Sequence, residues 1–321
     1  RSTPLYSSAA SDVYKRQFST CWNSQKHTDG YAMVEEIISL GFTTIEISHG
    51  LKVSLLPGII KAFEENLISI CGVHNFCPSP VEVMMDAPDC YEFTSHREHE
   101  RKRAIDLTTR TIETAARFNA NYVVLHLGSV PMRKISPKLE KLIIHGNEDS
   151  KKFTKLKDKL IKKRSQLSPL YLERAKDSLE KIIGKAEEHN VKLAIESRSA
   201  YEDVPNEIEM IELMKEYENN PLVGYWHDFG HVHRKHNLGL LNHYEWLKTM
   251  RPFIIGGHLH DVKWPHRDHH VPFSGQINFE DLMKNFNPLS PIVVELSSRR
   301  STEDIKKSME NWSKKDFEYA Q

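Results

Sequence analysis

Histidine and acidic side chains gather in one short stretch of the chain, Gly257-His258-Leu259-His260-Asp261-Val262-Lys263. An apolar run at 253–255 precedes it, which predicts a β-strand that ends in this stretch. Because side chains alternate across a strand, His258 and His260 face one side and Leu259 the other. Two imidazoles on one face of a strand end are typical of a metal site. The stretch therefore predicts one corner of such a site.

Five further apolar runs end in residues of the same kind. Eight runs predict strands, at 18–21, 44–48, 68–74, 122–127, 191–196, 222–227, 253–260 and 292–296, and six of them end in chemistry-bearing side chains: His74, His126, Glu196, Asp228, His258 and Glu295. Such groups are costly on barrel strands unless they are paired, hydrogen-bonded or bound to metal. Carboxylates together with imidazole suit Mn²⁺, Mg²⁺, Co²⁺ or Zn²⁺. For the histidines at 227, 233, 236 and 243, we expect hydrogen-bonded structural roles instead.

Amphipathic segments separate the strands and predict helices at 31–40, 101–118, 170–189, 207–217, 244–250, 279–285 and 302–312, with a weaker one at 57–66. Eight strand–helix units in sequence predict a single α/β domain, a (β/α)8 TIM barrel over residues 17–315. A doubly wound nucleotide-binding fold is disfavoured, because Asn23-Ser24-Gln25 follows the first strand where a glycine-rich turn would stand. In such a barrel the carboxyl ends of the strands converge on the active site.

Composition narrows the classes of protein further. Lys and Arg balance Asp and Glu at 44 each, which gives no electrostatic footprint for nucleic acid. No apolar run reaches the roughly 18 residues that a membrane span needs. Four cysteines without C-x-x-C spacing favour a reducing, cytoplasmic location. Residues 1–16 are rich in Ser and Ala and aperiodic, and we expect a disordered or non-native leader there.

One lysine-rich segment, residues 131–168 after the fourth strand, departs from the strand–helix rhythm. Between Arg133 and Arg164 it holds twelve Lys or Arg against four Asp or Glu, so 12 − 4 = +8. One interpretation is a solvated helical insertion over the barrel mouth. The other is a basic lid for a phosphorylated or nucleic-acid substrate.

From about residue 18 to 312 these motifs resemble the xylose isomerase-like barrel superfamily, which includes sugar isomerases and epimerases, inosose dehydratases and endonuclease IV. The epimerase branch implies one divalent ion held by Glu196, Asp228, His258 and Glu295. The family's His-x-x-acid pattern selects His258 over His260 as the ligand. The tail at 271–279 is similar to a segment of the isomerase branch, although Ser274 and Gln276 depart from it.

The resemblance implies an enzyme, a metal-dependent sugar or polyol isomerase or epimerase. Glu196 and Glu295 would transfer protons through an enediolate, assisted by His231 in the Asp-x-x-His step after the sixth strand. Substrate contacts would come from Glu202, His260, Lys263, His74 and His126. The partner would be a small sugar or polyol, and self-association is consistent with the resemblance.

The endonuclease IV branch implies an alternative, a phosphodiester hydrolase with up to three metal ions. Its nine ligand positions match His74, His126, Glu196, Asp228, His231, His258, Asp268, His270 and Glu295. In that branch, aromatic and basic residues near strand two and after the strand-three His probe DNA, whereas here those regions read Ser48-His49-Gly50 and Asn75-Phe76-Cys77. A third hypothesis is a metal-stabilised barrel that binds sugar without turnover.

Overall fold

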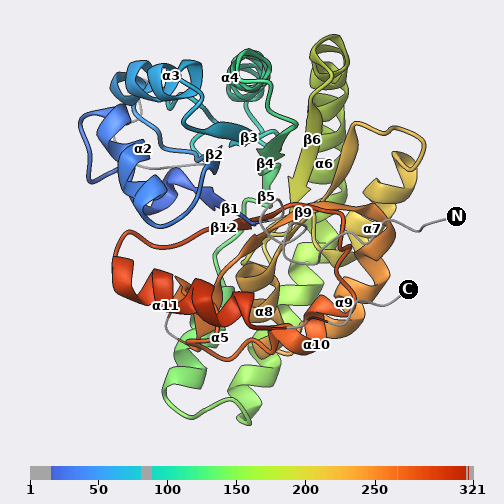
Figure 1. The fold of residues 1–321 in the computed structure, drawn as a ribbon. Coiled ribbons are helices and arrows are strands. Elements are labelled where there is room, and N and C mark those ends of the chain that lie inside the picture. Colours follow the sequence, from blue (N-terminus) through green and yellow to red (C-terminus); the bar gives the residue numbers. More distant parts are fainter. Residues whose placement is uncertain (1–15, 81–88, 266, 316, 318–321) are drawn as a thin grey trace, which may run out of the picture.

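A closed barrel of eight parallel strands forms the centre of the computed structural model (Figure 1), which describes residues 16–80, 89–265, 267–315 and 317. The strands lie in the order β1-β12-β9-β8-β6-β4-β3-β2 and close through β1 and β2. Their bounds are β1 Arg16–Ser19, β2 Thr44–Ile47, β3 Ser69–His74, β4 Tyr122–Leu125, β6 Lys192–Glu196, β8 Val223–Asp228, β9 Ile254–Leu259 and β12 Ile292–Val294. The predicted (β/α)8 barrel is therefore confirmed.

Helices surround the barrel: α2 Gly30–Ser39, α3 Leu56–Glu64, α4 Glu98–Arg117, α5 Ser136–Ile144, α6 Lys151–His189, α7 Glu207–Glu216, α8 Phe229–Asn237, α9 His243–Met250, α10 Phe279–Met283 and α11 Thr302–Ser313. Three short 3₁₀ turns lie at Thr20–Trp22, Val53–Leu55 and Arg251–Phe253. Two small antiparallel pairs extend from the barrel, β5 (Gly128–Ser129) with β7 (Asp203–Val204) and β10 (Asp261–Lys263) with β11 (Arg267–His270). In the described part of the chain, no helix is long and apolar enough to cross a membrane.

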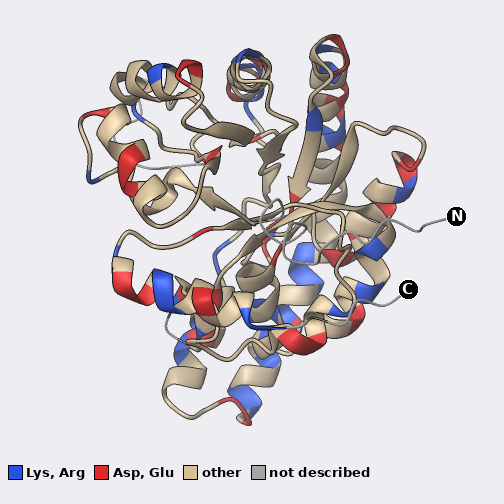
Figure 2. Cartoon of the chain, viewed as in Figure 1, with Lys and Arg blue, Asp and Glu red and all other residues tan. Residues whose placement is uncertain are grey.

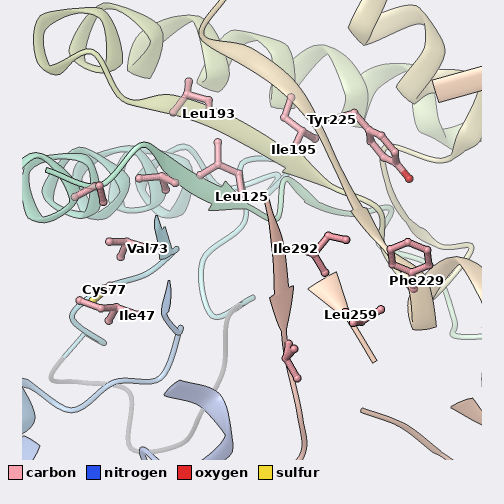
Figure 3. Close-up of a cluster of buried hydrophobic side chains, with 14 of the residues drawn as sticks. Ile47, Val73, Cys77, Leu125, Leu193, Ile195, Tyr225, Phe229, Leu259 and Ile292 are labelled. Atoms are coloured by element: carbon pink, nitrogen blue, oxygen red, sulfur yellow. The ribbon is translucent and has the colours of Figure 1, made fainter. Parts of the chain in front are cut away.

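Alternation along the strands sorts side chains between two cores. Outward residues such as Leu125, Leu193 and Ile195 pack in the apolar layer between strands and helices (Figure 3). A separate cluster of buried residues contains Val124, Ala194, Trp226 and Val293. Two positions after each of these four residues come His126, Glu196, Asp228 and Glu295. The alternation therefore places these histidine and carboxylate side chains above the inner cluster, at the carboxyl ends of the strands.

Two glycines leave room for the aromatic rings of this inner cluster. A Cβ at Gly72 would lie 2.0 Å from the Tyr122 ring, and one at Gly256 would lie 2.0 Å from the Trp226 ring. The two rings pack on each other with centroids 4.5 Å apart. Tyr122 and Trp226 therefore form a floor beneath the strand ends.

The basic segment folds as helices, α5 and the first half of α6. The predicted helix at 170–189 is the second half of the same α6, which runs through Pro169 for 39 residues and, at 1.5 Å per residue, for roughly 58 Å. Figure 2 shows Lys and Arg along its first half. Phe153 and Leu160 pack with α5 and with Leu238 in a small apolar cluster. The segment is thus a helical insertion attached to the barrel by one apolar face.

Arg164 is the exception among the basic residues of the insertion, because its side chain is buried. Its guanidinium donates to both carboxylate oxygens of Glu209, at 2.5 and 2.7 Å, and to the carbonyl oxygens of Tyr201 and Asp203. Glu209 also completes a capping box at the start of α7 with Asn206. Arg164 therefore ties α6 to the loop after β6.

We expect Arg164→Ala to lower the free energy of unfolding by about 3–5 kcal/mol, because it leaves the buried Glu209 carboxylate without its cation. Lys163→Ala, at the exposed neighbouring position, should change it by no more than about 0.5 kcal/mol. Urea denaturation of both variants measures the difference. Equal stability of the two variants would contradict the anchoring role.

A chain of hydrogen-bonded histidines lies between β8, α8 and α9. His227 contacts Tyr225 Oη through Nδ1 (2.9 Å) and His243 through Nε2 (3.0 Å), and His243 Nδ1 lies 3.3 Å from His233 Nδ1. Burial, with a smaller effect of His236, lowers the pKa of His233 to about 4. The structure places these histidines in hydrogen-bonded positions outside the strand-end cluster.

Because the folded state holds His233 neutral, an unfolded chain takes up a proton that the folded chain refuses below about pH 6.5. We expect the free energy of unfolding to fall as the pH drops from about 6.5 to 4. His233→Gln should reduce that slope by up to about 1.4 kcal/mol per pH unit. Denaturation curves between pH 7 and 4.5 test this, and an unchanged slope in the variant would contradict it.

Candidate active site

Four buried side chains meet at the carboxyl ends of neighbouring strands: Glu196 (β6), Asp228 (β8), His258 (β9) and Glu295, which follows β12. One ligand atom from each lies within 4.8 Å of the others. His258 Nδ1 faces all three carboxylates, at 3.1 Å from Glu196 Oε1, 3.2 Å from Glu295 Oε2 and 3.7 Å from Asp228 Oδ2. Three carboxylates and one imidazole form a donor set that fits a divalent ion.

The electrostatics of this group arise from carboxylates buried beside imidazoles. Burial alone would raise the pKa of Glu196, but His126, His231 and His258 outweigh burial and hold that pKa well below its usual value. The pKa of Glu295 is likewise held low, against the effect of burial, by His258 and His269. Burial would lower the pKa of His258, yet the carboxylates around it raise that pKa well above its usual value. The buried carboxylates therefore favour a positively charged group at the centre of the site.

Asp228 has a second task, because it begins α8. Its Oδ1 accepts the backbone N–H of His231 at 2.7 Å, so Asp228 is the N-cap of the helix. The same helical turn brings the His231 ring beside the carboxylates, with Nδ1 3.5 Å from both Glu196 Oε1 and Asp228 Oδ2. The Asp-x-x-His spacing is thus a capping geometry that places both side chains in the site.

His74 and His126 approach the other oxygen of Glu196. His126 Nε2 lies 2.6 Å and His74 Nε2 3.3 Å from Glu196 Oε2. Together these three residues form a second group of potential metal ligands. On its far side, His126 Nδ1 lies 2.9 Å from Asp89 Oδ1.

His260 supports Asp228. Its Nδ1 accepts the backbone N–H of His269 at 2.9 Å, which places the proton on Nε2. That N–H then points at the Asp228 carboxylate, at 2.9 and 3.0 Å from the two oxygens. His231, His260 and His269 lie close enough to form a third ligand group, but both nitrogens of His260 are already engaged. This tautomer favours a supporting role for His260 over metal binding.

A cavity of about 390 Å³ opens above the four-residue group. Its lining includes five residues that the sequence analysis singled out, His74, His126, Glu196, His231 and Glu295. It also includes residues that sequence reasoning missed: Gln25, His49, Arg198, His269, Ser297 and Ser298. His49 and Arg198 follow predicted strand ends, so the strand-end pattern could have identified them. His269 has a left-handed backbone (φ 53°), which interrupts the extended conformation of the strand, and its side chain lines the cavity.

Three residues expected to bind substrate lie outside this cavity lining: His260, described above, Glu202 and Lys263. Glu202 is buried, where it accepts the backbone N–H groups of Ile135 and Ser136 and so holds the start of α5. Lys263 is exposed on β10. Glu202 thus lies at the start of the insertion and Lys263 on the surface, and contact of either residue with substrate stays a prediction.

Asp268 and His270, the additional ligands expected by analogy with endonuclease IV, are engaged elsewhere. Asp268 pairs with Arg234, with Oδ2 2.6 Å from Nη1, and contacts the His269 ring. His270 Nδ1 lies 2.9 Å from Arg300 Nη1. Within the described residues, neither belongs to a group of potential metal ligands. The structure therefore does not bring them into the site.

Comparison with solved structures finds proteins of similar fold, several of which are named as sugar epimerases. A D-tagatose 3-epimerase-like protein superposes with a TM-score of 0.63 at 19% identity, over 93% of this chain and 96% of that one. A 3-keto-D-glucoside 4-epimerase from E. coli gives 0.60 at 15%, over 88% and 93%. A structure of the IOLI protein with a bound zinc atom gives 0.61 at 16%, over 93% and 96%. At these identities the likeness shows the fold.

Among curated protein sequences, no significant match to the chain is found. A family model described as the xylose isomerase-like TIM barrel matches residues 34–315, which is most of the chain and includes every residue of the four-residue group. The chain therefore belongs to the xylose isomerase-like TIM barrel family.

Proposed function

We propose that this protein is a divalent-metal-dependent isomerase or epimerase of a sugar or sugar-like polyol. The observation that carries the proposal is the convergence of Glu196, Asp228, His258 and Glu295 around one point beneath an open polar cavity. The solved structures of similar fold are named as sugar epimerases in several cases, which supports this choice of chemistry.

The four-residue group would hold the ion, because three buried carboxylates gain stability from a cation at their centre. A divalent ion there would act as a Lewis acid toward a carbonyl and a neighbouring hydroxyl, and so make the adjacent C–H bond more acidic. Mn²⁺, Mg²⁺, Co²⁺ and Zn²⁺ all accept oxygen and nitrogen ligands of this kind.

Glu196 and Glu295 are suited to move the protons. Both line the cavity, and the low pKa of each keeps it in the anionic form that a general base requires. Their strands are separated by β8 and β9 in the barrel, so the two carboxylates approach from different sides. One would take a proton from carbon, and the other would return one to the opposite face or to the neighbouring carbon.

The cavity matches a small, hydroxyl-rich substrate. Its volume of about 390 Å³ lies within the roughly 300–1,000 Å³ range of small-molecule sites. Imidazole, amide and hydroxyl groups line it alongside the carboxylates. Arg198 also lines the cavity, but its guanidinium is already paired with Asp89, with Nη2 2.7 Å from Oδ2. These features support a neutral sugar or polyol over an anionic one.

A phosphodiester hydrolase is the second candidate, and the group His74, His126 and Glu196 favours it because it could hold a second ion. Cleavage of a duplex that contains an abasic site, at low salt, separates the two functions. We expect no cleavage. Cutting that depends on His74 and His126 would favour the hydrolase.

Metal content is expected to follow the four-residue group. Purified protein dialysed against Mn²⁺ or Zn²⁺ should retain one ion per chain, and His258→Ala should lose it. His270→Gln should retain it, because His270 lies against Arg300 outside the group. Elemental analysis of the three proteins measures this. Loss of metal from His270→Gln, or its retention in His258→Ala, would contradict the assignment.

Turnover should depend on the cavity carboxylates. With a panel of ketoses in D₂O, wild type should exchange a carbon-bound proton and form the epimer or isomer, as followed by NMR. Glu295→Gln removes one base and should slow the exchange by about 10²–10⁴-fold. Exposed Glu280→Gln is the matched control and should leave the rate unchanged. The non-catalytic sugar-binding alternative predicts no exchange in any of these proteins.

A further inference from the structure

A fourth carboxylate, Glu46 on β2, lies beneath the four-residue group and contacts one of its members, His258. Its side chain is 0% exposed. Glu46 Oε1 lies 3.0 Å from His258 Nε2, and Oε2 accepts the Tyr122 hydroxyl at 3.2 Å. Strand β2 is separated from β9 by β1 and β12, so this contact crosses the barrel interior.

We infer that Glu46 is a positioning residue, which fixes the tautomer and orientation of His258 so that Nδ1 is the nitrogen offered to a metal ion. The inference rests on the proposed function, because it presumes that the four-residue group binds metal. It adds a residue that shapes the site from below without lining the cavity.

The tautomer follows from the two neighbours of the imidazole. An imidazole nitrogen beside a carboxylate oxygen carries a proton, since two lone pairs would otherwise face each other, and without a metal ion both nitrogens of His258 have such neighbours. Glu46 therefore holds the proton on Nε2. A cation at the point shared by Glu196, Asp228 and Glu295 would take the place of the proton on Nδ1, whereas Nε2 faces Glu46 away from that point and keeps its proton.

Packing restricts the ring in the same orientation. Trp226 contacts the His258 ring edge-on, with centroids 5.2 Å apart, and the His74 ring stacks on it at 5.7 Å and 7°. Tyr122, which also packs on Trp226, in turn supports Glu46. The aromatic floor and the Glu46 carboxylate therefore hold the His258 ring in one orientation together.

Glu46 supports a ligand and does not itself join the group. It faces Nε2, whereas the other carboxylates face Nδ1, and no potential ligand group within the described residues includes it. His260 bears the same relation to Asp228. Outer partners of this kind typically alter metal affinity by about 10–100-fold.

The test compares metal affinity in Glu46→Gln, Tyr122→Phe and wild type, by competition with a chromogenic chelator for Zn²⁺. Glu46→Gln keeps the shape but removes the charge, and its dissociation constant should rise about 10–100-fold. Tyr122→Phe leaves the Glu46–His258 contact intact, so its rise should be smaller. Glu202→Gln is the matched control, because Glu202 is equally buried but contacts only the start of α5.

A second measurement reads the tautomer itself. In the zinc-loaded wild type, the ¹⁵N NMR signals of the His258 ring should show Nδ1 bound to metal and Nε2 protonated. Zinc on Nε2, or equal affinities of Glu46→Gln and wild type, would overturn the inference. So would an equal loss of affinity in Glu46→Gln and Glu202→Gln.

These results separate the inference from the proposed function. If wild type binds zinc and Glu46→Gln binds it equally well, only the proposed role of Glu46 is refuted. Weakened binding in a protein that converts no sugar removes the epimerase and leaves the role of Glu46 intact. A wild type that binds no divalent ion overturns both.

Discussion

The structure depends on one electrostatic constraint: three carboxylates, Glu196, Asp228 and Glu295, are buried around a single point. Buried carboxylates are stable only with hydrogen bonds and nearby positive charge. In the described part of the chain, imidazoles of His126, His231, His258 and His269 supply much of that compensation. A divalent ion at the centre would satisfy the same demand more fully, which is why the donor set supports a metal site.

The (β/α)8 barrel meets this constraint with a simple repeat. Strand alternation carries small or aromatic residues inward, and the chemical groups follow two positions later. Gly72 and Gly256 make space for Tyr122 and Trp226, so the floor beneath the site is closed by rings. Contacts that hold the site come from outside this repeat as well. Asp228 caps α8, and Glu46 reaches His258 from the far side of the barrel.

Much of this arrangement could be predicted from the sequence. Strand ends are short apolar runs followed by His, Asp or Glu, and that local pattern located His74, His126, Glu196, Asp228, His258 and Glu295. Helix α8 was missed because histidines, including His233 and His236, obscure its apolar face. Glu46 was missed because it lies inside an apolar run. Asp268 and His270 were expected in the site, but His269 lines the cavity instead. Its left-handed backbone interrupts the strand alternation on which the expectation rested. Glu202 carries a backbone-capping role that only the folded insertion reveals.

We propose that one divalent ion binds among Glu196, Asp228, His258 and Glu295. The most direct measurement is anomalous X-ray diffraction from crystals of the protein loaded with Mn²⁺. We expect one strong peak within bonding distance of the three carboxylates and of His258 Nδ1. A peak elsewhere in the cavity with these four residues unbound, or no peak at saturating Mn²⁺, would contradict it.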